Sequence, residues 1–379
     1  MIDEMATEIK ISLPMLAIAD TSLTEAEIQA AVKVLRSGAL RQGGECDAFE
    51  AEFAARVGAP YAVSSSSGTA ALHLAYMTFL EPGDEVLVPS FTFIATGSVV
   101  CAAGGRPVFC DIDPETFLLD LADAERKLSP RTRAISPVHL FGSPCDVAAV
   151  HAFAAQHRLK IVWDAAQAHG ARWQERELGG CADFVAYSFY PTKNLFVGEG
   201  GMTCTPRREW AERMRYLRSH GQTGRYLHTL PGLNYRMSDV EAAIGRAQLH
   251  RFDAMLAARR RHAAILRNGL SSLQGLHLQK IVPGGEPAWH QFCFRVEAGA
   301  FGCDRNQLAQ KLANQGIATA VHYPRGLHQQ PVFRQLYGDT SLPTTEALAE
   351  SILAVPVHHG LAEDAAERIV AAMASARGA

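Results

Sequence analysis

The chain alternates short apolar runs with longer amphipathic stretches through its first half. Apolar runs typical of buried strands lie at 61–66, 84–90, 106–112, 133–140 and 160–166. Helix-like stretches separate them, at 68–80, 94–104, 121–128 and 146–157. Continuous apolar strands separated by helices predict a parallel sheet that is covered on both faces. Such a sheet binds its ligands at the carboxyl ends of its strands.

A different pattern begins near the end of the second third. Residues 238–270 form one long amphipathic helical stretch, with a predicted break near Arg251. Beyond it come a strand-like run, a helix, another apolar run and a final helix, at 292–297, 304–314, 318–324 and 362–376. We therefore predict a large domain over residues 12–250 and a smaller C-terminal α+β domain over residues 251–379.

The composition argues against a nucleic-acid-binding, membrane or metal-binding protein. The net charge of the 379 residues is −3, and the one basic cluster, RRRH at 259–262, is typical of a solvated helix face. We therefore expect no nucleic-acid partner. No run of 18 apolar residues is present, and the acidic N-terminus does not resemble a signal peptide, so we expect no membrane segment. The eight cysteines lack any CxxC pair, which predicts reduced thiols, a cytoplasmic location and no metal site.

The most unusual side chain for its position is Lys193, in YSFYPTKN at 187–194. It lies between two apolar runs that read as strands, 183–189 and 199–205. A lysine on such a loop either extends into water or is held inside a site. A desolvated lysine loses its proton more easily and can form an imine with an aldehyde. The choice between the two depends on whether the chain supplies partners.

Two other strand ends supply candidate partners. SSSSGTA at 64–70 ends a strand and opens a helix, so Gly68 and Thr69 would offer backbone N–H groups to a phosphate. Asp164 ends the strand IVWD and can hold a protonated ring nitrogen. Taken singly, each is better explained as a helix cap. Together with Lys193 they are the anchors of pyridoxal 5'-phosphate (PLP), in which a lysine imine and an Asp at the ring nitrogen hold an electron sink.

Many ordered motifs along the chain resemble one family, the sugar aminotransferases of the DegT/StrS type. The resemblance runs from about residue 12 to 375 and rests on SGALRQG, SSGTAALHLA, VPSFTF, FCDIDPETF, VHLFG, DAAQAHGA, SFYPTKNLFVGEGGM, LNYRMSDVEAAIG, HYPRGLHQQPVF and LPTTEALAESILAVPVH. It implies the α/β fold of PLP-dependent transferases of fold type I. In that fold a large domain with a mostly parallel seven-stranded sheet carries a smaller C-terminal α+β domain.

The resemblance also implies roles for individual residues. Lys193 would form the imine with PLP and then move protons, and Asp164 would pair with the ring nitrogen. Gln167 would lie near the phenolic oxygen, and Phe93 would stack on the ring unless it is an ordinary core aromatic. The phosphate would be bound by Gly68, Thr69, Ser188 and, from the second subunit of a homodimer with shared active sites, Asn234. The border of the sugar-nucleotide pocket would include His322, Tyr323 and His328.

The function that this resemblance implies is amino transfer from L-glutamate to a nucleotide-linked keto sugar. GEGGM at 198–202 is more similar to relatives that aminate C4 of a 4-keto-6-deoxy sugar. Two alternatives remain open: a cyclitol ketone of the inosose type as substrate, and a non-catalytic PLP-binding regulator of the same fold. A third branch of the family, which performs dehydration, has histidine in place of the lysine, so Lys193 argues against it.

Overall fold

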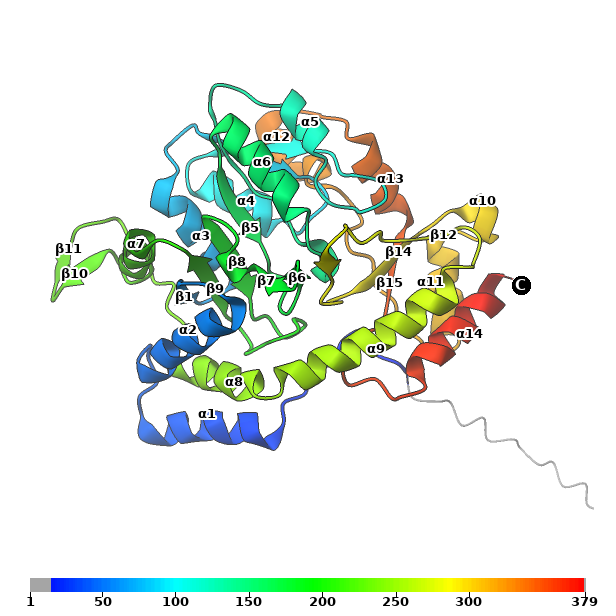
Figure 1. Ribbon diagram of the computed structural model, residues 1–379, viewed down its shortest axis with the longest axis horizontal. Helices are drawn as coiled ribbons and strands as arrows, with labels where there is room; N and C mark the ends of the chain where they lie inside the picture. The colour runs from blue at the N-terminus through cyan, green and yellow to red at the C-terminus, as the bar shows by residue number, and fades with distance from the viewer. Residues whose placement is uncertain (1–14, 378–379) are drawn as a thin grey trace, which may run out of the picture.

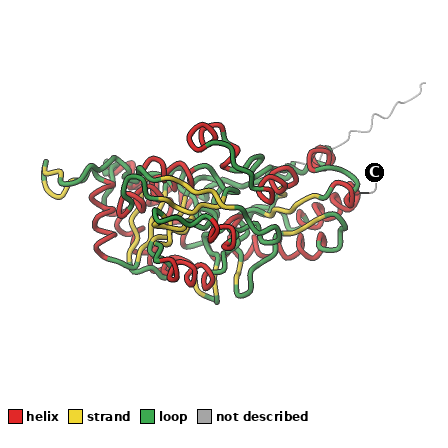
Figure 2. The backbone as a smooth tube through the Cα atoms, turned by 90° about the horizontal axis from the view of Figure 1, so that it is seen from above, coloured by secondary structure: helices red, strands yellow, loops and turns green. Residues whose placement is uncertain are grey.

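The structure is a computed structural model that describes residues 15–377. A broad sheet with its helices forms one end of the molecule, and a smaller group of strands and helices forms the other (Figure 1). Seen from above, helices lie on both sides of the strands (Figure 2). The predicted start of the large domain, at residue 12, lies outside the described residues.

Seven strands form the main sheet, in the spatial order β1-β9-β8-β5-β4-β2-β3. They are β1 (Tyr61–Ser65), β2 (Glu85–Pro89), β3 (Arg106–Cys110), β4 (Thr132–Ile135), β5 (Lys160–Asp164), β8 (Phe184–Ser188) and β9 (Gly201–Thr205). β9 runs antiparallel to both of its neighbours, and the other strand pairs are parallel. The predicted seven-stranded, mostly parallel sheet is confirmed. β4 is shorter than the predicted run 133–140, because Pro137 has no N–H to continue the ladder.

Helices and short elements surround this sheet. The helices are α1 (Glu25–Ser37), α2 (Gly44–Val57), α3 (Gly68–Phe79), α4 (Ala95–Ala102), α5 (Leu121–Arg126), α6 (Val147–His157), α7 (Arg208–Arg218) and α8 (Asp239–Leu249). The short elements are η1 (Leu140–Gly142), the hairpin β6 (Arg172–Trp173) and β7 (Arg176–Glu177), η2 (Leu178–Gly180), and the hairpin β10 (Gln222–Gly224) and β11 (Leu227–His228).

Side chains of β8 show how the sheet is covered on both faces. Phe184 and Ala186 belong to an apolar cluster that includes residues of α3, α4 and α7. Val185 and Tyr187 belong to a second cluster, with residues of α2 and α6. Successive side chains of a strand point to opposite faces, so a strand covered on both sides is apolar throughout. This is why all five residues of β8 are buried.

The C-terminal part is organised around α9 (Phe252–Leu270). Its remaining elements are β12 (Leu276–Leu278), β13 (Gly285–Glu286), β14 (Phe292–Val296), α10 (Ala298–Phe301), α11 (Arg305–Ala313), η3 (Leu327–Gln329), α12 (Pro331–Tyr337), α13 (Pro343–Ser351), β15 (Ile352–Val355) and α14 (Ala365–Arg377). Strands β12, β14 and β15 form an antiparallel sheet. Its side chains share a third cluster with α9, α11 and α14. The predicted α+β character of this part is confirmed.

The long helical stretch breaks between α8 and α9, as predicted. The break falls at His250 and Arg251, and the guanidinium of Arg251 pairs with the buried Glu27 of α1 at 2.5 Å. The predicted domain boundary between residues 250 and 251 stays a prediction, because side chains from the C-terminal part pack into the core of the large part. Leu327 and Phe333, for example, belong to the cluster of α3 and α4.

None of the helices among residues 15–377 is both long and apolar enough to span a membrane.

Candidate active site

A cavity of about 470 Å³ lies at the carboxyl ends of the parallel strands. One side is formed by Gly68, Thr69, Asp164, Ser188 and Lys193, and we refer to these five residues as the strand-end wall. A second side is formed by His290, Gln291, His322 and Tyr323, and we refer to these four as the C-terminal wall. The strand-end wall therefore brings together the predicted residues that follow β1, β5 and β8, as expected for an open parallel sheet.

The N-terminus of α3 offers free hydrogen-bond donors to this cavity. Ser67 caps the helix, and its hydroxyl accepts a hydrogen bond from the N–H of Ala70 at 3.1 Å. The N–H groups of Gly68 and Thr69, in the first turn, have no such partner within the described chain. A Cβ at Gly68 would lie 2.5 Å from the Cβ of Ser188, so only glycine allows this approach. The result is a seat suited to an anion such as a phosphate.

Asp164 is held in one orientation at the end of β5. Its Oδ2 accepts from the hydroxyl of Thr96 at 2.7 Å, and its Oδ1 accepts from the N–H of Ala166 at 3.0 Å. The side chain is buried, and burial raises the pKa of this carboxyl above its usual value, although both hydrogen bonds and Lys193 oppose the shift. A buried carboxylate that borders a cavity is stabilised by a cationic partner.

Lys193 lies on the segment that connects β8 to β9. Burial lowers the pKa of its ammonium from 10.5 to about 8, and the negative charge of Asp164 opposes this shift. The next residue anchors the segment, because the amide of Asn194 donates to the carbonyl of Ala288 at 2.8 Å. Lys193 therefore borders the cavity and is not a solvated loop lysine. At pH 7 about a tenth of it is a neutral, nucleophilic amine, which is far more than for a lysine with an ordinary pKa.

Gln167 and Phe93 border the same cavity. The Oε1 atom of Gln167 accepts from the N–H of Phe141 at 2.6 Å, and its Nε2 donates to the hydroxyl of Tyr323 at 3.1 Å. Gln167 thus links the loop after β5 to the C-terminal wall. The ring of Phe93 lies 6.1 Å from that of Tyr323, and 54% of the residue is exposed. Phe93 is therefore not a core aromatic, which was the alternative to ring stacking.

Two of the predicted residues do not line the cavity. Asn234 is exposed, in a segment that pairs with Ser219. His328 is buried, and its Nδ1 lies 2.6 Å from the hydroxyl of Ser90 while its Nε2 lies 3.0 Å from Glu346. These contacts join η3 to the loop after β2 and to α13, so within this chain they fix the position of η3.

The cavity also contains residues that the sequence did not single out. Thr192 and Glu199 flank Lys193 within the quoted motif, so proximity in sequence could have found them. Thr96 does not line the cavity but donates to Asp164 there, and it follows Phe93 by three residues, so it could have been found in the same way. His290 and Gln291 carry no such signal, because they lie between the predicted helical stretch 238–270 and the predicted strand 292–297. They reach the cavity only through the tertiary fold.

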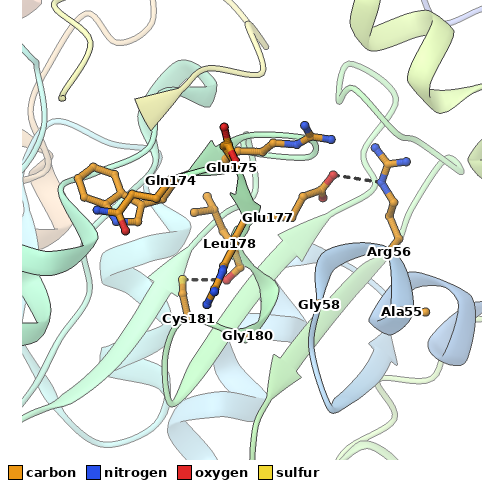
Figure 3. Close-up of a pocket in the computed structure, with 12 residues that line it drawn as sticks. Ala55, Arg56, Gly58, Gln174, Glu175, Glu177, Leu178, Gly180 and Cys181 are labelled. Carbon is orange, nitrogen blue, oxygen red and sulfur yellow. Dashed lines mark hydrogen bonds and ion pairs between the residues drawn. The ribbon is translucent and has the colours of Figure 1, made fainter. Parts of the chain in front are cut away.

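A larger cavity, of about 810 Å³, lies at the β6–β7 hairpin (Figure 3). Two of its charged side chains, Arg56 and Glu177, form an ion pair. Glu177 is directed at Arg56, with Nε and Oε1 3.1 Å apart, and Arg56 also pairs with Asp253 at 2.6 Å. None of the predicted site residues lines this cavity. Within residues 15–377, no group of three or more His, Cys, Asp or Glu side chains could hold a metal ion.

Comparisons with known proteins agree with the predicted family. Residues 21–374 match the model of the DegT/DnrJ/EryC1/StrS aminotransferase family. A dTDP-3-amino-3,4,6-trideoxy-alpha-D-glucose transaminase of Streptomyces venezuelae is 40% identical over 352 residues, which cover 92% of this chain and 91% of that protein. A UDP-N-acetyl-3-dehydro-alpha-D-glucosamine 3-aminotransferase of Acidithiobacillus ferrooxidans is 38% identical over 339 residues, or 89% of this chain and 90% of that one.

The fold is also similar to that of a solved structure. The crystal structure of S. venezuelae DesV in complex with a ketimine intermediate matches with a TM-score of 0.92 and 37% sequence identity. The match covers 97% of this chain and 100% of that chain. The predicted fold type I is confirmed by this similarity.

Proposed function

The chain belongs to the DegT/DnrJ/EryC1/StrS aminotransferase family, and from that premise we propose that it binds PLP and aminates a nucleotide-linked keto sugar. L-glutamate would be the amino donor, and the products would be an amino sugar nucleotide and 2-oxoglutarate. One observation carries the proposal: a lysine with a pKa of about 8 and a buried, oriented carboxylate border one cavity beside a free helix N-terminus.

The residues of the strand-end wall fit this cofactor. The N–H groups of Gly68 and Thr69 would bind its phosphate, and the carboxylate of Asp164 would meet the protonated ring nitrogen that a buried carboxylate favours. Phe93 would cover the ring, and Gln167 would lie near the phenolic oxygen. When bound, PLP supplies the electron sink that stabilises negative charge on the substrate carbon.

Lys193 would be the group that moves protons. Its Nζ must be neutral to accept a proton from the α-carbon of glutamate, and a pKa of about 8 keeps part of the population neutral at physiological pH. Asn194 fixes the loop through its hydrogen bond to Ala288, so the amine returns to the same place in every cycle. Because the donor and the sugar react in separate half reactions, we expect ping-pong kinetics.

The proposal also specifies which carbon of the sugar receives the amino group. The names of both relatives place the amino group at C3 of the sugar: one is a 3-amino-3,4,6-trideoxy-glucose transaminase and the other a 3-aminotransferase. These names favour C3, whereas GEGGM favours C4. We propose a keto sugar with its ketone at C3, and the C4 position and an inosose-type cyclitol ketone are the alternatives to be tested against it.

A homodimer with shared sites is part of the same proposal. Asn234 is exposed and does not line the cavity of its own chain. Nearby, the β10–β11 hairpin extends away from the body of the molecule (Figure 1), and Tyr226 and Leu227 at its turn are 83% and 58% exposed. Lys193 is the one lysine or arginine among the described residues that line the cavity. A site for a diphosphate sugar needs more positive charge than this, and a second subunit can provide it.

One experiment tests the proposed function directly. The PLP-loaded protein is mixed with ¹⁵N-glutamate and a panel containing 3-keto and 4-keto nucleotide sugars and an inosose, and the products are read by mass spectrometry. We expect the label to appear in the amino sugar formed from a 3-keto nucleotide sugar. Label in the 4-keto product would correct the position, label in the inosose product would correct the substrate class, and label in none would contradict the function.

A further inference from the structure

Two adjacent side chains of the C-terminal wall have buried polar atoms without partners. The Nδ1 atom of His290 and the Oε1 atom of Gln291 have no hydrogen-bond partner among the described residues. His290 is 6% exposed, and both side chains border the cavity. The Nε2 atoms of both side chains also have no hydrogen-bond partner among the described residues, and they are not enclosed by the protein. A ligand in the cavity can therefore reach these Nε2 atoms and supply the partner that polar atoms in folded proteins nearly always have.

The backbone around these residues is firmly held. The N–H of Ala288 donates to the carbonyl of Gly142 at 2.8 Å, and the N–H of Gln291 donates to that of Phe141 at 3.3 Å. On the other side, Arg259 is buried, so the prediction of a solvated face for RRRH is wrong at this residue. Its guanidinium donates to the carbonyls of Trp289 and His290 at 3.3 and 3.4 Å. Two side chains presented from such a rigid segment are suited to recognition, which requires fixed donors and acceptors.

The segment also contains an unfavourable backbone conformation. Trp289 has a φ of 51°, in the left-handed region that a bulky side chain rarely adopts. This turn separates the ring of Trp289, which stacks on Phe292, from the side chains of His290 and Gln291, which border the cavity. Strain that the surrounding contacts maintain is a common feature of ligand-binding segments.

The charge of this wall indicates what kind of group it binds. Burial and the nearby charge of Lys193 hold the pKa of His290 well below its usual value, so its imidazole is neutral. Gln291 is neutral as well. A neutral imidazole and an amide each offer one hydrogen-bonding edge that donates and one that accepts, which matches a hydroxyl group. A carboxylate or phosphate would instead need cations.

We propose that His290 and Gln291 bind a ring hydroxyl of the sugar substrate and thereby determine which keto sugars are accepted. The inference rests on the proposed function and adds to it a recognition element. Asn194 joins the segment to the loop of Lys193 through the carbonyl of Ala288, so the bound hydroxyl keeps a fixed position relative to the reacting amine. The hydroxyl on a carbon next to the ketone is the first one to test, because it lies closest to the carbon that reacts.

The test compares the two half reactions in shape-conserving variants. His290→Phe keeps a ring and Gln291→Met keeps the length of the side chain, while each removes the hydrogen-bonding atoms. In the PLP-loaded protein, we expect kcat/KM for the keto sugar half reaction to fall about 10–100-fold. The glutamate half reaction, followed by loss of the visible band, should change by less than about threefold. Gln174→Met, in the other cavity, is the matched control and should leave both unchanged.

A second readout does not depend on turnover. Calorimetry with an unreactive nucleotide sugar that has its hydroxyls in place should show weaker binding to both variants, by about 10-fold. A matched sugar that lacks the hydroxyl next to the reacting carbon should bind wild type and variants equally, as in a double-mutant cycle. If His290→Phe fails to fold, His290→Asn replaces it, since asparagine keeps a hydrogen-bonding group at this position. His290→Asn should then bind the hydroxylated sugar normally, and only Gln291→Met should bind it more weakly.

The outcomes separate this inference from the proposed function. Equal losses in both half reactions, or unchanged binding of the hydroxylated sugar by the variants, would overturn the role of His290 and Gln291 while leaving the aminotransferase intact. A wild-type protein that reacts with glutamate but with no nucleotide keto sugar would overturn the proposed substrate, and this inference with it.

Discussion

The two walls of the cavity are constructed in different ways. The strand-end wall takes its residues from the loops after β1, β5 and β8, so the order of strands in the sheet alone brings Gly68, Asp164 and Lys193 together. The C-terminal wall takes its residues from two segments that follow α9, and side-chain hydrogen bonds from Asn194 and Arg259 hold one of them in place. The topology of the sheet thus positions the catalytic side chains, whereas tertiary contacts position the side chains that we propose for substrate recognition.

Substitution of Lys193 should have the largest effect on the strand-end wall. Lys193→Ala should abolish the visible band of the PLP imine and reduce both half reactions by about 10⁴-fold or more, because the nucleophile and the proton carrier are one group. Lys193→Arg should not restore them, since a guanidinium stays protonated. The thermal midpoint of the cofactor-free protein should change little. Steady-state turnover in the alanine variant would contradict the assignment.

Asp164 should give the next largest effect. Asp164→Asn keeps the shape of the side chain but removes the charge opposite the ring nitrogen, so both half reactions should slow by roughly 10²–10³-fold. PLP binding through Lys193 should persist. Thr96→Val keeps the charge and removes one hydrogen bond at 2.7 Å, so a smaller loss of about 10-fold is expected. If stopped-flow rates of Asp164→Asn are near those of the wild type, Asp164 acts only as a helix cap.

Asn234 tests whether the strand-end wall is completed by a second subunit. Asn234→Trp should place a bulky ring over the partner's phosphate seat and leave the homodimer inactive. Mixed with Lys193→Ala under subunit exchange, it should recover activity, up to about half of the sites per hybrid, because one site then carries neither change. Proven exchange without recovery, or a monomer in sedimentation at working concentration, would exclude shared sites.

The pH dependence of cofactor binding should give the smallest of these effects. Lys193 attacks as a neutral amine, so with a pKa of about 8 its reactive fraction falls as the pH drops below that value. The second-order rate of imine formation with PLP should fall about tenfold from pH 7 to pH 6 and level off above pH 8. A rate that rises steadily to pH 10 would describe an ordinary solvated lysine.

The same difference explains why the residues of the strand-end wall could be predicted from the sequence, whereas His290 and Gln291 could not. Continuous apolar strands predicted the sheet, and the strand ends predicted Gly68, Asp164 and Lys193, because these features depend on short stretches of chain. The left-handed turn at Trp289 leaves no pattern in the sequence. The placement of His328 at the pocket border stays a prediction from its motif. In the structure its ring contacts Ser90 and Glu346, and no local pattern encodes those distant contacts.

Borohydride reduction tests most directly whether the strand-end wall binds PLP with Lys193 as its covalent anchor. The PLP-loaded protein is reduced, digested and analysed by peptide mass spectrometry, with unreduced protein as the control. We predict one pyridoxyl adduct, on the peptide that contains Lys193, in parallel with the loss of the visible band. An adduct confined to another lysine, or none despite stoichiometric PLP, would contradict the account.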